Sequence, residues 1–232
     1  MEEMFKNSLF FGMVLSLGSY AFGMFLKKKF TNSLVNPFLI SVIVSICTLL
    51  FFKIDYEIYY QSARFLSFFL TPATVCLAVP LFEQLKLLKK NFWAIVLGIF
   101  SGALASAISI YILCFLLKLP KEMLVTLLPK TVTTAIGIAI AEELAGFSTI
   151  TVATIVVTGI LGNVFAEICF KIFKITNPIS QGVALGTSAH AMGTAKALEM
   201  GQIQGAMSGL SIIITGIFTV ILAPIFARLY VF

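Results

Sequence analysis

Four stretches of this chain contain no Asp, Glu, Lys, Arg or His, and each is long enough to cross a bilayer core, which takes about 20 apolar residues as a helix. They are Asn7–Leu26, Asn91–Leu117, Ala145–Ala166 and Gly201–Ala227. Only 11% of the 232 residues are charged, against about 25% in a soluble domain. The sequence therefore predicts an all-α membrane protein and excludes a soluble domain.

Two shorter apolar segments, Pro37–Phe52 and Phe65–Phe82, are weaker candidates for spans. Counting them predicts about six full transmembrane helices in a single polytopic domain, residues 1–232. Three groups of lysines then fall on one side, which the positive-inside rule makes cytoplasmic, with the N-terminus outside. Basic residues on the opposite face weaken this assignment: Lys53, Arg64, Lys118 and Lys121.

Two further segments, Glu122–Glu143 and Ile179–Glu199, have polar centres. In the first, Pro129 lacks an amide hydrogen and disfavours helical geometry in the residue before it, so the helix should break there. The threonines that follow can cap a new helix. In the second, small and hydroxyl-bearing residues predict close backbone approach and a break at Thr187–Thr194. We expect both segments to be interrupted or re-entrant, although full crossing remains the alternative.

A weak internal similarity indicates duplication of the two halves, residues 1–118 and 119–232. The run Thr71–Val75, followed by Glu83–Leu85, resembles Pro129–Val132, followed by Glu142–Leu144. Paired interrupted segments in two halves, as in an inverted repeat, are typical of secondary transporters with a substrate site near the membrane midplane.

Several classes of function are excluded by what the sequence contains. The four cysteines lie singly in apolar segments and there is one histidine, so neither a metal site nor a disulfide framework is expected. No catalytic motif or phosphate-binding loop occurs, which argues against an enzyme and against a cofactor. The net charge of +6 comes from lysines at helix ends, so no nucleic-acid partner is expected.

Several short motifs in the chain resemble the LrgB/CidB family. They are Phe69–Thr74, Leu128–Thr134 and, above all, Thr176–Ile179 followed by Gly182–His190. The resemblance implies a protein of the bacterial cell membrane that modulates murein hydrolases and autolysis, encoded beside a small LrgA/CidA-type membrane partner. Similar proteins also include a plastid carrier of glycolate and glycerate, and bacterial members linked to pyruvate.

Residues at the two breaks are the candidate substrate site. Hydroxyls and a free helix N-terminus favour an anion, and a lysine or charged histidine can pair with a carboxylate. The candidates are Lys130, Thr131, Thr133, Thr134, Thr187, Ser188, His190, Gly193 and Thr194. The alternatives are ordinary capping by the threonines, a lysine that reaches the membrane interface, and a histidine that bonds a neighbouring backbone carbonyl.

His190, Glu142 and Glu143 are the candidates for proton coupling, because histidine titrates near neutral pH. The two glutamates fit a solvated turn equally well. These observations favour a carrier of a small monocarboxylate such as pyruvate or glycolate, coupled to protons or sodium. The rival interpretation is an antiholin-like or holin-like protein that acts by oligomerisation with its small partner, without carrier activity. In both interpretations we expect a homo-oligomer.

Overall fold

A computed structural model describes residues 10–30, 36–69, 72, 75–76 and 78–231 of the chain. All regular secondary structure in these ranges is helical, which confirms the predicted all-α class. The fold divides into two compact units, unit 1 (Met1–Cys76) and unit 2 (Leu77–Phe232). The boundary expected at residue 118 lies inside unit 2, and the assignment of one membrane domain stays a prediction.

Unit 1 contains α2 (Phe11–Lys29), α3 (Pro37–Phe51), α4 (Tyr56–Ala63) and the 3₁₀ helix η1 (Arg64–Phe69). Asn36 starts α3, because its side-chain oxygen accepts hydrogen bonds from the amides of Phe38 and Leu39 at 2.9 and 3.2 Å. Pro37 occupies the first helical position, where its missing amide hydrogen costs nothing.

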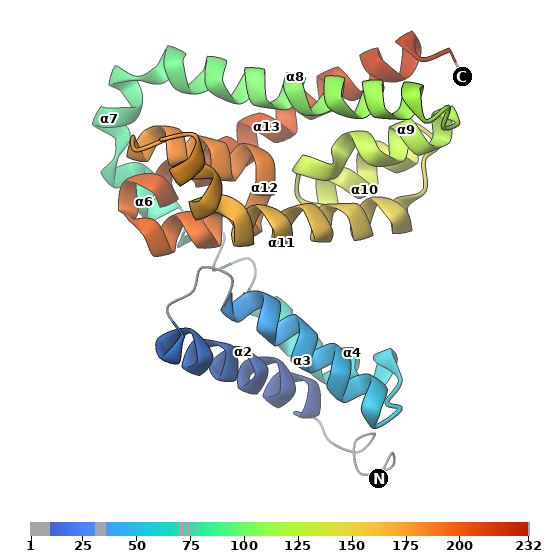
Figure 1. Cartoon of the computed structure of the whole chain (residues 1–232), viewed down its shortest axis with the longest axis vertical. Helices are drawn as coiled ribbons and strands as arrows, with labels where there is room; N and C mark the ends of the chain where they lie inside the picture. Colours follow the sequence, from blue (N-terminus) through green and yellow to red (C-terminus); the bar gives the residue numbers. More distant parts are fainter. Residues whose placement is uncertain (1–9, 31–35, 70–71, 73–74, 77, 232) are drawn as a thin grey trace. The chain divides into compact units, whose positions relative to one another are not determined.

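Unit 2 contains both short and long helices. In chain order they are α6 (Ala78–Glu83), α7 (Leu85–Lys90), α8 (Phe92–Leu116), α9 (Lys121–Leu127), the 3₁₀ helix η2 (Leu128–Thr131), α10 (Thr134–Glu143), α11 (Ser148–Ile172), α12 (Pro178–Met200) and α13 (Gln202–Leu229). Helices α8 and α11 lie along opposite sides of the unit, with α10 and α12 between them (Figure 1). Helix α12 packs against α8, α11 and α13, so it is the centre of the unit.

Three helices are long and apolar enough to cross a membrane among the residues searched: α8, α11 and α13. Unit 1 adds the shorter apolar helix Pro37–Phe51. In the segment Phe65–Phe82 the described residues are helical, with the 3₁₀ helix η1 at the start and the short helix α6 at the end. The prediction of six full spans is therefore not confirmed. Asn7, Ser8 and Leu9 of the first predicted span lie outside the described residues, as do Thr71, Ala73 and Thr74 of the internal similarity.

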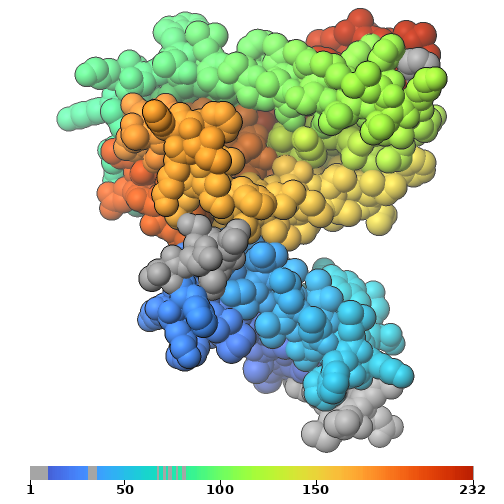
Figure 2. Space-filling view, in the orientation of Figure 1, coloured from blue at the N-terminus to red at the C-terminus, as the bar shows by residue number. Residues whose placement is uncertain are grey.

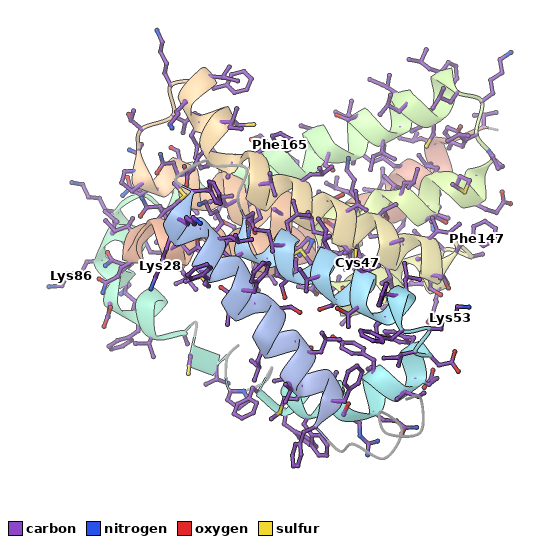
Figure 3. The ribbon with its side chains drawn as sticks, turned by 60° about the horizontal axis from the view of Figure 1, so that its bottom comes forward. Lys28, Cys47, Lys53, Lys86, Phe147 and Phe165 are labelled. Atoms are coloured by element: carbon purple, nitrogen blue, oxygen red, sulfur yellow. The ribbon has the colours of Figure 1, made fainter. Side chains whose placement is uncertain are left out.

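Large apolar side chains stand on the outside of the long helices. On α13, Ile213, Ile217 and Ile221 are each more than half exposed and repeat every four residues, which makes one continuous stripe. Phe147, just before α11, and Phe165, within it, also lie outside, and Lys86 projects from the end of the unit (Figure 3). In water such a surface would drive association, so these faces indicate a membrane protein.

Both segments that the sequence predicts to be interrupted contain breaks in the helix. Pro129 has non-helical dihedral angles (φ −84°, ψ 20°), Val132 is extended, and a new helix starts at Thr134. In α12 the break is at His190, with φ +43° and ψ −131°. Thr133 occupies the N-cap position of α10 as predicted, but its side chain forms no capping hydrogen bond.

Glycines allow α12 to pack closely on α13. A Cβ atom built on Gly186 would collide with the carbonyl oxygen of Ser208 and would lie 2.7 Å from the Cβ of Ser211. Gly209, by contrast, has no atom within 4 Å of a Cβ built on it. The backbone at Ser208 has no flexible end that could move aside, so Gly186 must remain without a side chain.

We predict that Gly186→Ala lowers the thermal unfolding temperature of the detergent-purified protein, because α12 and α13 must move apart. Gly209→Ala is the matched control. It should leave that temperature unchanged or raise it slightly, since alanine favours a helix over glycine by about 1 kcal/mol. Equal unfolding temperatures for the two variants would contradict the close packing at Gly186.

Candidate functional site

A cavity of about 920 Å³, open on one side, lies in unit 2 between α8, η2, α11 and α12; Ser101, Ala105 and Ser188 in its lining are exposed. Along α8 its lining runs from Asn91 at the helix start to Ser109, and along α12 from Ile179 to Ser188. In the space-filling view the side chains of α8 and α11 form two bands across one face of the unit (Figure 2). From its lining residues, the cavity extends from the start of α8 to beyond the middle of that helix, and from the start of α12 to about its middle.

Lys130 is the cationic side chain in the lining of this cavity. It is half-buried, and it forms no ion pair or hydrogen bond with any residue in the described ranges. None of the lining residues in the described part of the chain is an Asp or Glu. The ammonium group of Lys130 is thus a positive charge without a protein partner in the described ranges, at the wall of this cavity.

Hydroxyl groups surround the same space. Ser106 on α8 and Thr187 on α12 both line the cavity, and their buried hydroxyl oxygens have no hydrogen-bond partner among the described residues. Thr131 on η2 and Thr158 on α11 contribute two further hydroxyls to the lining. Buried polar groups are almost always hydrogen-bonded, so the two unpartnered hydroxyls in the lining of this cavity are exceptional.

The structure brings together residues from both predicted breaks. Lys130 and Thr131 from the first break line the cavity with Thr187 and Ser188 from the second. Ser188 differs from Thr187 because its hydroxyl donates to the carbonyl of Ala184 in its own helix, at 2.7 Å. Four of the nine candidate residues thus share one cavity.

The other candidates lie elsewhere. Thr133 and Thr134 start α10 and do not line the cavity. The hydroxyl of Thr194 forms a hydrogen bond with the hydroxyl of Ser208 at 2.8 Å and therefore links α12 to α13.

Two further groups of candidates also lie away from the cavity. A Cβ on Gly193 would collide with the carbonyl oxygen of Leu185, so this glycine allows the two parts of α12 to approach each other. Glu142 and Glu143 are exposed at the end of α10.

His190 is buried beside the backbone of α11. Its Nε2 atom lies 3.0 Å from the carbonyl oxygen of Ile155, and it does not line the cavity. Gly159 makes this possible, because a Cβ there would lie 2.9 Å from the same Nε2 atom. Just beyond the break, Asn163 donates to the carbonyl of Met192 at 2.8 Å. These contacts fix the broken part of α12 against α11. A role of His190 in substrate binding or proton transfer stays a prediction.

The backbone at His190 is strained. The other non-glycine residues with positive φ in the described ranges are Lys53, Lys118, Ala145 and Lys174. Each is the second residue after the end of a helix, where a left-handed residue is common. His190 alone has positive φ inside a helix, in a combination of φ and ψ that side chains disfavour. Such strain costs about 1–3 kcal/mol and persists only where the surroundings enforce it.

We predict that His190→Gly unfolds at a higher temperature than His190→Ala. Both variants lose the imidazole bond to Ile155, but only glycine adopts φ +43° and ψ −131° without strain. The expected difference is about 1 kcal/mol or more, measured by thermal unfolding of both variants in the same detergent. A more stable alanine variant would argue against a break at this position.

Three residues with a clear place in the structure were not predicted from the sequence. Ser106 and Thr158 line the cavity from apolar helices, and the only available signal was a hydroxyl in an otherwise apolar run. Lys196 is buried on α12 and pairs with Glu167 of α11 at 2.6 Å and with Glu199 at 3.6 Å. Lys196 is thus paired, in contrast to Lys130.

The chain is similar to known proteins over nearly its whole length. The model of the LrgB-like family matches residues 16–229. The antiholin-like protein LrgB of Bacillus subtilis (strain 168) is 34% identical over 223 residues, which cover 96% of each chain. The proteins of the same name from Bacillus mycoides (strain KBAB4) and Bacillus cereus (strain B4264) are each 33% identical over 218 residues, covering 94% of this chain and 95% of theirs. No solved structure matches.

Proposed function

We propose, because this chain belongs to the LrgB-like family, that it is a multi-pass carrier of a small monocarboxylate in a bacterial cell membrane. Its substrate would be of the pyruvate or glycolate class. Carriage of such an acid changes the energy state and the proton balance of the cell, and through them the activity of murein hydrolases and autolysis. In this proposal the protein itself transports the acid and catalyses no chemical reaction.

The observation that carries the proposal is the unpaired Lys130 in a cavity with unpartnered hydroxyls. A carboxylate accepts hydrogen bonds only, and a lysine and hydroxyls are the donors that suit it. The lack of Asp and Glu in the described lining disfavours a cationic substrate. In this proposal, Lys130 binds the carboxylate, and Ser106, Thr131, Thr158 and Thr187 donate to its oxygens or to the adjacent oxo or hydroxyl group.

The breaks at Pro129 and His190 supply the moving parts of the proposed carrier. Broken helices near the midplane, packed against intact ones, are the usual elements of alternating access. The cavity reaches Asn91 and Asn177, which are next to the lysine groups expected at the cytoplasmic side. We therefore propose that it opens to the cytoplasm. Coupling to protons or sodium, with His190, Glu142 and Glu143 as candidates, is part of the proposal.

The alternative is an antiholin-like protein that acts by oligomerisation with a small LrgA/CidA-type membrane protein. The names of the Bacillus relatives favour it, and the exposed apolar stripe on α13 offers a surface for a partner or a second copy. In that case the lining hydroxyls and Lys130 have no required ligand.

Equilibrium binding to the detergent-purified protein tests the proposal. Calorimetric titration with pyruvate and glycolate should give saturable binding, whereas ethylamine, a cation of similar size, should not bind. Binding that falls as salt rises would fit an ion pair at a partly hydrated lysine. The absence of binding by both acids would favour the antiholin-like alternative.

A further inference from the structure

A second cavity, of about 380 Å³, adjoins the first at Lys130 and Thr158, which line both. Along α8 the polar cavity is lined from Asn91 to Ser109, and the second cavity from Ile110 to Leu117. The two cavities thus extend in opposite directions along α8, with Lys130 where they meet. We call the second cavity the apolar chamber.

The apolar chamber is polar only at this junction. Its walls come from α8, α9 and α11, and they are mainly aliphatic: Ile110, Leu113, Leu117, Leu127, Ala153 and Val157. Leu113, Leu117 and Val157 are each more than half exposed, so the chamber is a groove that is open on one side. Of the other polar groups in the wall, the hydroxyl of Thr154 already donates to the carbonyl of Thr151 at 2.9 Å. Cys114 adds a thiol, which behaves as a small apolar group. The chamber therefore suits an aliphatic group whose charged end is at Lys130.

We infer that the preferred substrate is an amphiphilic monocarboxylate, with its carboxylate at Lys130 and Thr158 and a short aliphatic tail in the apolar chamber. This inference rests on the proposed carrier function and narrows its substrate class to 2-oxo acids longer than pyruvate. A volume of 380 Å³ is more than ten times the roughly 30 Å³ that one water molecule occupies, so a tail of several carbons fits. The oxo group, on the carbon next to the carboxylate, lies at the junction of the two cavities, and water occupies the polar cavity.

Burial of the tail predicts that binding affinity depends regularly on the length of the aliphatic chain. Each methylene moved from water into an apolar site strengthens binding by about three- to fourfold. Affinity should therefore rise from pyruvate through 2-oxobutyrate to 2-oxopentanoate, and level off once the chamber is full. A site without the chamber would bind these acids alike or would reject the longer ones.

The experiment measures inhibition of labelled pyruvate uptake into proteoliposomes by each 2-oxo acid, for the wild type and two filled variants. Ala153→Leu fills the apolar chamber, and Ala105→Leu, the matched control, fills the polar cavity. Ala153→Leu should remove the gain in affinity with chain length, measured relative to the affinity of the same variant for pyruvate. Ala105→Leu should weaken all the acids by a similar factor. Val157→Phe fills the same chamber if Ala153→Leu cannot be purified folded.

The outcomes separate the two proposals. Pyruvate uptake without any gain with chain length in the wild type would overturn the chamber assignment and leave the carrier intact. A gain that persists in folded Ala153→Leu would also overturn it, because the tail would then lie in the lipid or elsewhere. No pyruvate uptake at all would instead count against the carrier function itself.

Discussion

Replacing Lys130 by methionine should weaken the binding of pyruvate by about 30-fold to several thousand-fold. This range corresponds to the roughly 2–5 kcal/mol lost when one partner of a buried, hydrogen-bonded charge pair is removed, and half-buried Lys130 should fall at its lower end. Methionine keeps the length and the apolar part of the side chain, so the change removes mainly the charge. Because Lys130 has no protein partner in the described ranges, the variant should fold at least as well as the wild type.

The matched control for Lys130→Met is Lys121→Met. Lys121 is exposed at the start of α9, only nine positions away, and does not line the cavity. Its replacement should leave pyruvate affinity within about twofold, because exposed charges interact weakly through water. Lys130→Arg keeps the positive charge and should retain part of the affinity. Equal affinities for the wild type and Lys130→Met would remove Lys130 from the proposed site.

Replacing Thr187 by valine should weaken pyruvate binding by about 10- to 150-fold. A hydrogen bond to a charged group contributes about 1.5–3 kcal/mol, and valine has nearly the same shape without the hydroxyl. The empty protein should not be destabilised, because the hydroxyl of Thr187 is buried without a partner and its removal relieves that cost. Lower affinity together with unchanged or higher stability is characteristic of a ligand-binding hydroxyl.

Thr215 provides a close control for Thr187. Its hydroxyl is also buried without a partner among the described residues, but it lies on α13 and does not line the cavity. Thr215→Val should therefore leave pyruvate affinity unchanged while affecting stability in the same direction. If calorimetry showed the same loss of affinity in both valine variants, the effect would be a general one on packing, and Thr187 would have no special role.

The positions of the two breaks could be predicted from the sequence because their causes are local. Pro129 lacks the amide hydrogen that a helix continuing through this position would need, and the small residues around His190 predicted a break that the structure has at that residue. The number of spans could not be predicted in the same way. Hydropathy does not distinguish a long α-helix from a segment that begins as a 3₁₀ helix, as Phe65–Phe82 does.

The composition of the site was harder to predict because it depends on which hydroxyls are left unpaired. Ser101 and Ser109 of α8 bond carbonyl groups of their own helix at 2.8 and 2.6 Å, whereas Ser106 does not. Nothing in the local sequence separates these serines. The contact of His190 with Ile155 likewise depends on Gly159, which is 31 residues away in the chain and adjacent only after folding.

Uptake of labelled pyruvate by proteoliposomes that contain the purified protein alone tests the central claim most directly, with Lys130→Met and Lys121→Met measured in parallel. We predict saturable uptake by the wild type and Lys121→Met, and uptake close to that of empty liposomes by Lys130→Met. Uptake by Lys130→Met equal to that of the wild type, or no uptake of pyruvate or glycolate by the correctly folded wild type, would contradict a carrier whose site is centred on Lys130.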